Sequence, residues 1–166
     1  MTEPERLIEK HAAGGLLIDS NLLLLLFVGR MNRRRIANFR RTSAYDASDY
    51  ELLEHLVSVF HRTLTTPHIL TEVSNLASLS GSELASVREV MKDFVEIMEE
   101  LHEPSRVVVQ DRAFHRLGIT DAAISSACAG LLVLTDDFDL YDSLGRRGID
   151  AINFNHLREW RRQLTS

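Results

Sequence analysis

The stretch that decides the fold lies at residues 118–140, GITDAAISSACAGLLVLTDDFDL. Its first half is rich in small residues and is opened by Asp121, which predicts a closely packed helix that stops at Gly130. The uninterrupted apolar run 131–134 is typical of a strand covered on both faces of a parallel sheet. Polar residues follow it directly: Thr135, Asp136, Asp137 and Asp139. This end of a strand is where open α/β sheets place their ligand crevices.

Length and composition are those of an ordinary globular protein. A chain of 166 residues predicts one domain, 1–166, that is long enough to bury a core. The hydrophobic share of 45% and the charged share of 26% exclude a disordered chain. Cys128 is the only cysteine, so a disulfide framework and a thiolate zinc site are excluded, and we interpret it as a small core residue.

No stretch of the sequence predicts a membrane span. The apolar run 22–28 has seven residues, whereas a spanning helix needs ~20. The first ten residues are rich in acids, unlike the basic start of a signal peptide. We therefore expect a cytoplasmic protein with no targeting segment and no membrane partner.

Strand and helix patterns alternate along the chain. Strands are expected at residues 16–18, 68–70, 107–109, 131–134 and 149–154. Helices are expected at 4–12, 22–28, from Asp46 or Ser48 to about 60, 71–80 with Thr71 as its cap, 82–101, 111–117 and 156–164. This alternation predicts an α/β fold: a single-domain, three-layer α/β/α arrangement around a central, mostly parallel sheet.

Acidic residues stand at the same kind of position in four segments. Asp19 ends the first strand, Glu72 and Asp121 each follow a threonine that we expect to cap a helix, and Asp137 and Asp139 follow the central strand. In a parallel sheet, strand carboxyl ends and the starts of the following helices share one edge, so these acids should converge. Bare carboxylates would repel one another, and Mg²⁺ or Mn²⁺ with oxygen ligands would relieve that repulsion.

Each acid taken singly also has an ordinary structural explanation. It could cap a helix, favour the positive end of a helix, or be a solvated loop residue, as Asp136, Asp139 and Asp142 could be. The convergence of the whole set is what argues for a site. Asp136 is the exception, and we expect it to be a neighbour of the site rather than a ligand.

Four short blocks carry a resemblance to a known family. They are DSN at 19–21, TEVSNL at 71–76, GITDAA at 118–123 and TDDFD at 135–139. In this order they resemble the four signature blocks of the PIN domain, over a match that extends from about Leu16 to the C-terminus. Within that superfamily the chain resembles the VapC-type toxin ribonucleases of prokaryotic toxin–antitoxin pairs.

The resemblance implies a function and a set of residues. It implies a PIN-like fold and a Mg²⁺- or Mn²⁺-dependent RNA endonuclease that hydrolyses phosphodiester bonds. Its catalytic and metal-binding acids would be Asp19, Glu72, Asp121 and Asp137, with Asp139 as a fifth metal ligand and with Asn21 and Thr135 as supporting polar residues. Its partners would be RNA, a protein antitoxin and a second copy of the chain.

An arginine-rich segment lies between the first two blocks. Residues 30–41 hold six arginines and no acid: Arg30, Arg33, Arg34, Arg35, Arg40 and Arg41. The whole chain has a net charge of −5, so the segment is a local basic arm on an acidic body. We expect these arginines to bind RNA phosphates, or else to dock an acidic partner. The remaining alternative is a solvated loop.

Other classes of protein fit the sequence less well. Receiver domains and haloacid-dehalogenase-like phosphatases rely on a lysine late in the fold, but the only lysines are Lys10 and Lys92. A P-loop nucleotidase is excluded because no glycine-rich loop with Lys-Ser/Thr exists. The seven histidines lack ligand spacing, so we treat them as surface or packing residues. The alternative from a different class is a catalytically inactive, PIN-like module that binds RNA or a partner protein, and the acids in all four blocks argue against it.

Overall fold

A five-stranded sheet forms the centre of the molecule, for which a computed structural model describes residues 2–165. The strands are β1 (Leu16–Ile18), β2 (Thr63–Thr65), β3 (Glu99–Glu100), β4 (Leu132–Thr135) and β5 (Ala151–Asn153). Their order is β3-β2-β1-β4-β5, and every neighbouring pair is parallel. Ile18 pairs with Leu134, so the carboxyl ends of β1 and β4 lie side by side.

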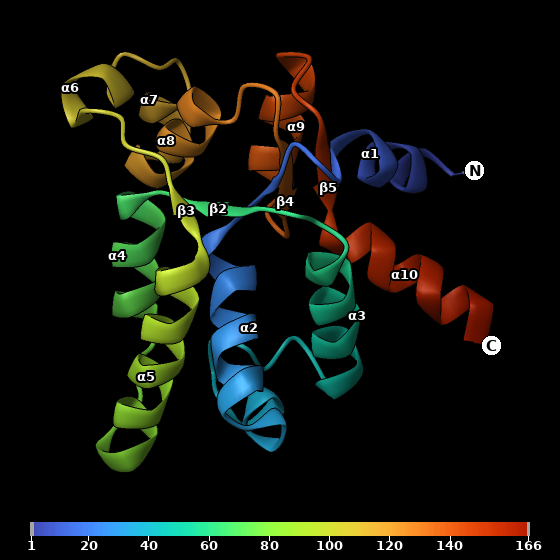
Figure 1. Cartoon of the computed structure of the whole chain (residues 1–166), viewed down its shortest axis with the longest axis vertical. Helices are drawn as coiled ribbons and strands as arrows, with labels where there is room; N and C mark the ends of the chain where they lie inside the picture. The colour runs from blue at the N-terminus through green and yellow to red at the C-terminus, as the bar shows by residue number, and fades with distance from the viewer. Residues whose placement is uncertain (1, 166) are drawn as a thin grey trace.

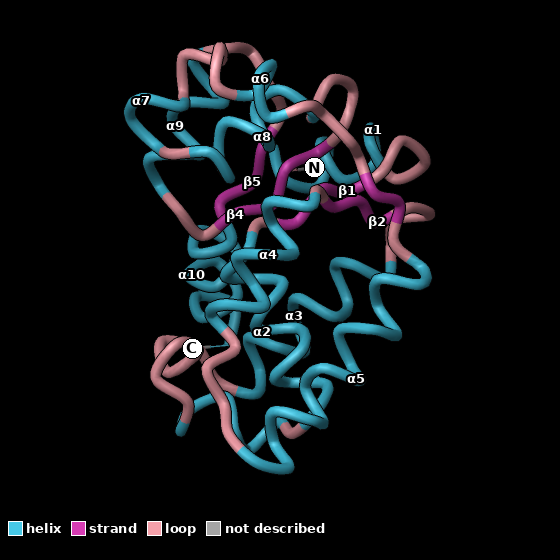
Figure 2. Tube along the Cα trace, turned by 90° about the vertical axis from the view of Figure 1, so that its left-hand side faces the viewer, coloured by secondary structure: helices cyan, strands magenta, loops and turns pink. Residues whose placement is uncertain are grey.

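Helices cover both faces of this sheet. They are α1 (Glu3–His11), α2 (Ser20–Met31), α3 (Ala47–Ser58), α4 (Pro67–Leu76), α5 (Gly81–Ile97), α6 (Ser105–Val108), α7 (Phe114–Leu117), α8 (Ile119–Ala127), α9 (Phe138–Arg146), α10 (Phe154–Thr165) and a 3₁₀ helix, η1 (Arg33–Asn38). Figures 1 and 2 show α2, α3 and α5 on one side of the strands and α6 to α9 on the other. The predicted three-layer α/β/α arrangement is confirmed, and the sheet is parallel throughout.

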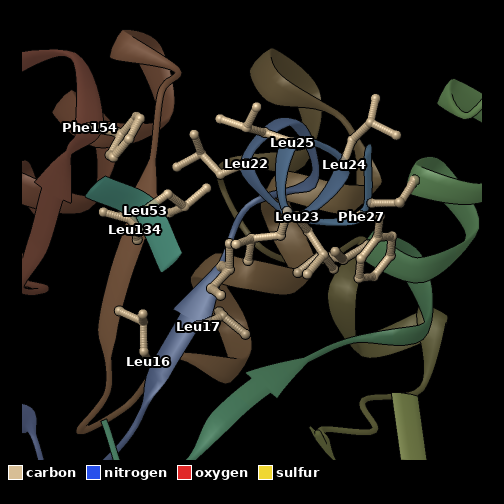
Figure 3. Packing of buried hydrophobic residues seen from close by; sticks show 14 of the residues in the cluster. Leu16, Leu17, Leu22, Leu23, Leu24, Leu25, Phe27, Leu53, Leu134 and Phe154 are labelled. Atoms are coloured by element: carbon tan, nitrogen blue, oxygen red, sulfur yellow. The ribbon is translucent and has the colours of Figure 1, made fainter. Parts of the chain in front are cut away.

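Helix α2 is the centre of the hydrophobic core. Every residue from Leu22 to Gly29 is buried, because the helix contacts η1, α3, α4, α5 and the sheet. Figure 3 shows its leucines and Phe27 in one core cluster with Leu17 of β1 and Leu134 of β4. Burying one such leucine side chain contributes roughly 1.5–3 kcal/mol, which explains the uninterrupted apolar run. Among residues 2–165, no helix has both the length and the apolarity needed to cross a bilayer.

The strand predicted at residues 68–70 is wrong. Those residues belong to α4, whose N-cap is Thr66: its Oγ1 accepts a hydrogen bond from the Ile69 backbone N–H at 3.2 Å, and Pro67 follows at the first helical position. A Thr-Pro start outweighs a short apolar triplet. Thr71, predicted to be the cap, lies inside the helix and donates from Oγ1 to the Pro67 carbonyl at 2.8 Å. The strand of this region is β2.

The strand predicted at residues 107–109 is also wrong. Val107 and Val108 lie in the short helix α6. The edge strand is β3, two exposed glutamates that follow the C-cap of α5, Met98. An exposed strand of two acidic residues has no apolar signal in the sequence. It pairs with β2 through Leu64 and Thr65, so a contact distant in sequence defines it.

Two helix starts near the acids differ from the prediction. Thr120 does not cap α8, which begins at Ile119 after Gly118 in the left-handed region (φ +89°) and ends at Ala127, short of Gly130. Helix α9 was not predicted: residues after Asp137 continue directly into a helix. Its buried Leu140 and Leu144 face the core four residues apart.

Candidate functional site

A cavity of about 290 Å³ lies at the carboxyl edge of the sheet, beside the ends of β1 and β4. Four acids from four separate elements line it: Asp19, Glu72, Asp121 and Asp137. Ser20, Asn21 and the residues from Leu117 to Thr120 complete the wall. The structure therefore brings together all four acids that the sequence singled out. No basic residue is found among the described residues that line this cavity.

Asp19 is held rigidly by its position between β1 and α2. It is 6% exposed and is the N-cap residue of α2, with its Oδ1 accepting from the Ser20 backbone N–H at 2.6 Å. The buried Thr135 hydroxyl donates to Asp19 Oδ2 at 2.5 Å. The same hydroxyl oxygen accepts from the Asp137 backbone N–H at 3.0 Å. Thr135 thus ties the ends of β1 and β4 to each other and fixes two acids at once.

Asp137 and Glu72 are anchored by different contacts. Asp137 is the N-cap of α9, where its Oδ1 accepts from the backbone N–H groups of Asp139 (2.7 Å) and Leu140 (3.1 Å). That leaves Asp137 Oδ2 for a ligand. Glu72 lies in the second turn of α4, and its Oε2 accepts from the Ser20 hydroxyl at 3.1 Å. Glu72 therefore reaches the cavity from inside a helix rather than from a helix start.

Burial and repulsion raise the pKa values of two acids of the cavity. Burial raises the pKa of Asp121 to about 7, and the negative charges of Asp19, Asp137 and Glu72 add to the effect. Burial likewise raises the pKa of Asp19 to about 7, with Asp136 and Asp137 adding repulsion, although hydrogen bonds from Thr135 and Ser20 oppose the shift. Such a set of carboxylates is stabilised by a proton or by a cation.

Asp136 takes part in a separate hydrogen-bond network. Its carboxylate accepts from the Tyr45 hydroxyl and from Asn21 Nδ2 at 3.2 Å, and its carbonyl accepts from Asn155 Nδ2 at 3.1 Å. These contacts fix the turn between β4 and α9. Sequence reasoning missed Tyr45 and Asn155, because both come from segments that carry no motif.

Asp139 is the predicted metal ligand that the structure does not bring into the cavity wall. It is exposed in the first turn of α9 and is absent from the cavity wall. The other four acids supply only oxygen donors, which is the ligand type that Mg²⁺ and Mn²⁺ prefer. Within residues 2–165 no three His, Cys, Asp or Glu side chains already stand close enough to hold one ion together. The fit to a divalent cation rests on the donor type and on the uncompensated charge.

The arginine-rich segment divides into two sets. Ion pairs with glutamates of α3 and α5 hold one set: Arg30 with Glu54, Arg33 with Glu51 and Glu54, and Arg35 with Glu83. The other set is exposed, and its side chains have no partner among the described residues: Arg34, Arg40 and Arg41. Half of the six arginines are therefore neutralised by glutamates outside the segment.

Comparisons with known proteins identify no family. No protein-family model matches the chain, and no curated protein sequence matches it significantly. The candidate site is thus defined by the geometry of the chain itself.

Proposed function

We propose that this protein is a metal-dependent RNA endonuclease of the PIN type, which hydrolyses phosphodiester bonds. One observation carries the proposal: four carboxylates, from the end of β1, from α4, from α8 and from the start of α9, converge on one cavity. The part of the chain that the structure describes adds no basic residue to its wall. Asp19 is buried and Asp121 is half-buried in this wall, and the pKa values of both are raised to about 7. Strongly shifted pKa values are typical of functional sites.

The residues of the cavity fit a hydrolytic role. Asp19, Glu72, Asp121 and Asp137 would hold Mg²⁺ or Mn²⁺, which supplies Lewis-acid activation of water and charge neutralisation at a phosphate. Thr135 and the Ser20 backbone fix the orientation of Asp19, and the cap of α9 fixes Asp137. Rigid anchoring of this kind keeps the acids oriented before the substrate arrives.

The nature of the substrate and the biological role rest on two further arguments. The exposed Arg34, Arg40 and Arg41 offer unpaired positive charge to a polyanion. The resemblance of the four sequence blocks to VapC-type toxins supports RNA as that polyanion. The same resemblance supports a toxin role with a protein antitoxin and a homodimer.

The test is metal-dependent cleavage of an end-labelled RNA. We expect cleavage with Mg²⁺ or Mn²⁺ and none in excess EDTA. Replacing Asp121 by Asn should lower the cleavage rate by about 100-fold or more, because one of the four charges at the reacting phosphate is lost. Asp142→Asn is the matched control, since Asp142 lies on α9, pairs with Arg146 and is outside the acidic cavity.

Two results would overturn the proposal in different ways. Undiminished RNA cleavage in excess EDTA would exclude the metal-dependent mechanism. RNA binding without cleavage in either metal would instead favour the inactive binding module, whose acids would then serve only to bind.

A further inference from the structure

A second cavity, of about 500 Å³, adjoins the acidic one. It lies between α4 and the first turn of α8, two helices that contact each other and appear one above the other in Figure 1. Glu72, Ile119 and Thr120 line both cavities, so the two are neighbours that share part of their walls. The volume is in the range of about 300–1,000 Å³ that small ligands occupy in proteins. We call this second cavity the α4–α8 groove.

One face of α4 forms the longer wall of the groove. His68, Glu72 and Asn75 all line it, and their spacing of four and then three residues puts them on the same side of the helix. Glu72 is therefore flanked by His68 one turn before it and by Asn75 one turn after it. A ligand in the groove would lie directly against one of the four acids.

The groove wall combines apolar, polar and cationic groups. Pro67, Leu76 and Ile119 provide apolar surface, and the half-buried His68 provides an aromatic ring. Asn75 is exposed and provides an amide with both donors and an acceptor. Arg41 stands in the wall with no side-chain partner among residues 2–165. The carboxylates at one end of the groove would repel an anion, whereas the guanidinium of Arg41 would attract one. An anion would therefore bind beside Arg41.

We propose that the α4–α8 groove is a nucleotide-recognition subsite that holds the nucleotide next to the cleaved phosphate, with Asn75 as the residue that reads its base. A nucleobase has apolar faces and a polar edge, which match the apolar wall with its histidine ring and the Asn75 amide. A neighbouring phosphate binds Arg41. This inference deepens the proposed nuclease function and rests on it for the identity of the ligand.

Binding without metal tests the subsite separately from catalysis. The probes are fluorescently labelled RNA hexamers of A, C or U, and anisotropy is measured in EDTA. We expect the Kd values of the wild-type chain to differ among the three hexamers by about threefold or more, and Asn75→Leu to remove that difference. Asn75→Trp should fill the groove and raise all three Kd values about tenfold. Arg41→Gln should weaken all three equally and flatten the salt dependence by about one unit of slope.

Matched controls lie on α5, away from the groove. Ser86→Trp adds the same ring, and Lys92→Gln removes the same charge, at exposed positions that line neither cavity. Neither should change the Kd, and melting temperatures of all variants establish that they fold.

Each outcome decides one question. Wild-type Kd values in Asn75→Trp and Arg41→Gln, or no RNA binding by the wild-type chain, would overturn the subsite. Binding that depends on Asn75 and Arg41, but without cleavage in Mn²⁺, would support the subsite while overturning the nuclease function. If RNA cleavage depends on metal but the groove variants bind and discriminate the hexamers like wild type, the nuclease function is supported and the subsite is overturned.

Discussion

Two buried aspartates of this molecule have opposite surroundings. Asp49 of α3 is fully buried and accepts hydrogen bonds from Arg158 Nη2 and Arg161 Nη2 of α10, each at 2.7 Å. Asp19 is 6% exposed and is held by the uncharged groups of Ser20 and Thr135, while the negative charges of Asp136 and Asp137 raise its pKa. One carboxylate has two cations, and the other has only further acids.

The difference separates a structural charge from a functional one. Desolvating a carboxylate costs several kcal/mol, which is offset when cations and hydrogen bonds surround it. The two arginines do this for Asp49, which joins α3 to α10. No cation of residues 2–165 forms an ion pair with Asp19 or Asp121, so a proton or a bound ligand must stabilise them. A buried acid without a cation is for this reason a better pointer to a site than a buried acid alone.

The largest expected effect is on thermal stability: Asp49→Asn and Asp121→Asn should change the melting temperature in opposite directions. Asp49→Asn leaves two half-buried arginines, Arg158 and Arg161, without their buried counter-charge. It should lower the free energy of unfolding by about 3 kcal/mol, a fall in melting temperature of about 6–12 °C. Asp121→Asn removes one repelling charge and should raise the melting temperature in EDTA by a few degrees. Thermal unfolding followed by circular dichroism measures both.

The control for this pair is again Asp142→Asn, which removes an exposed i,i+4 ion pair and should change the free energy of unfolding by less than about 0.5 kcal/mol. A marked loss of stability in Asp121→Asn would mean that Asp121 has a structural role. An unchanged melting temperature in Asp49→Asn would remove the contrast between the two carboxylates.

A smaller effect is expected in the pH dependence of stability without metal. The pKa values of Asp19 and Asp121 are raised to about 7, so between pH ~4 and 7 the folded chain holds protons that the unfolded chain releases. Stability from these two groups therefore falls as pH rises through that interval. Lys10 lowers the pKa of Asp150 and the Ser48 hydroxyl lowers that of Asp46, and the stability from these groups is lost as pH falls below ~4.

The two trends place the highest melting temperature in EDTA at pH ~4, where they meet. We expect the melting temperature to decline by several degrees from pH 5 to pH 8, and the decline to be shallower in Asp121→Asn. Addition of Mn²⁺ at pH 8 should restore stability, because an ion that binds only the folded chain stabilises it. A melting temperature that rises steadily from pH 5 to pH 8 in EDTA would contradict the assigned repulsion.

The parts of the fold that could be predicted from sequence are those whose signal is local. β1 and β4 are buried on both faces, so all or nearly all of their residues are apolar. Such a run is visible in the sequence without knowledge of the neighbouring strand. β2 and β3 were not predicted because Thr63–Thr65 has one apolar residue, Leu64, and Glu99–Glu100 has none. Only pairing across the sheet makes these short segments strands. Helix α9 was not predicted because the acids at its start were interpreted as loop residues, although Asp137 is its N-cap.

The candidate site was predictable for a related reason. Asp19 directly follows β1, and Asp137 follows β4 after Asp136. The carboxyl ends of parallel strands lie at one edge of the sheet, so these two acids were expected to lie close together. Glu72 reached the same cavity although its helix start was predicted five residues too late, at Thr71 instead of Thr66, because the helix still projects it to that edge. The roles of Tyr45 and Asn155, and the place of Arg41 in the groove wall, depend on how distant segments pack, which no local pattern contains.

The smallest expected effect concerns two arginines, one with acidic partners and one without any among residues 2–165. Arg33 has two glutamate partners on α3, whereas Arg40 is exposed and has no side-chain partner among the described residues. Because exposed ion pairs contribute about 0.2–1 kcal/mol, Arg33→Gln should lower the melting temperature by about 1–3 °C and leave RNA affinity nearly unchanged. Arg40→Gln should leave the melting temperature unchanged but reduce the slope of log Kd against log salt by about one, since one fewer counterion is released when RNA binds. Anisotropy titrations at several salt concentrations, beside thermal melts, measure both. If Arg33→Gln reduced the salt slope as much as Arg40→Gln, its glutamate pairs would have to open when RNA binds, and a charge with an internal partner would no longer count as structural in this segment.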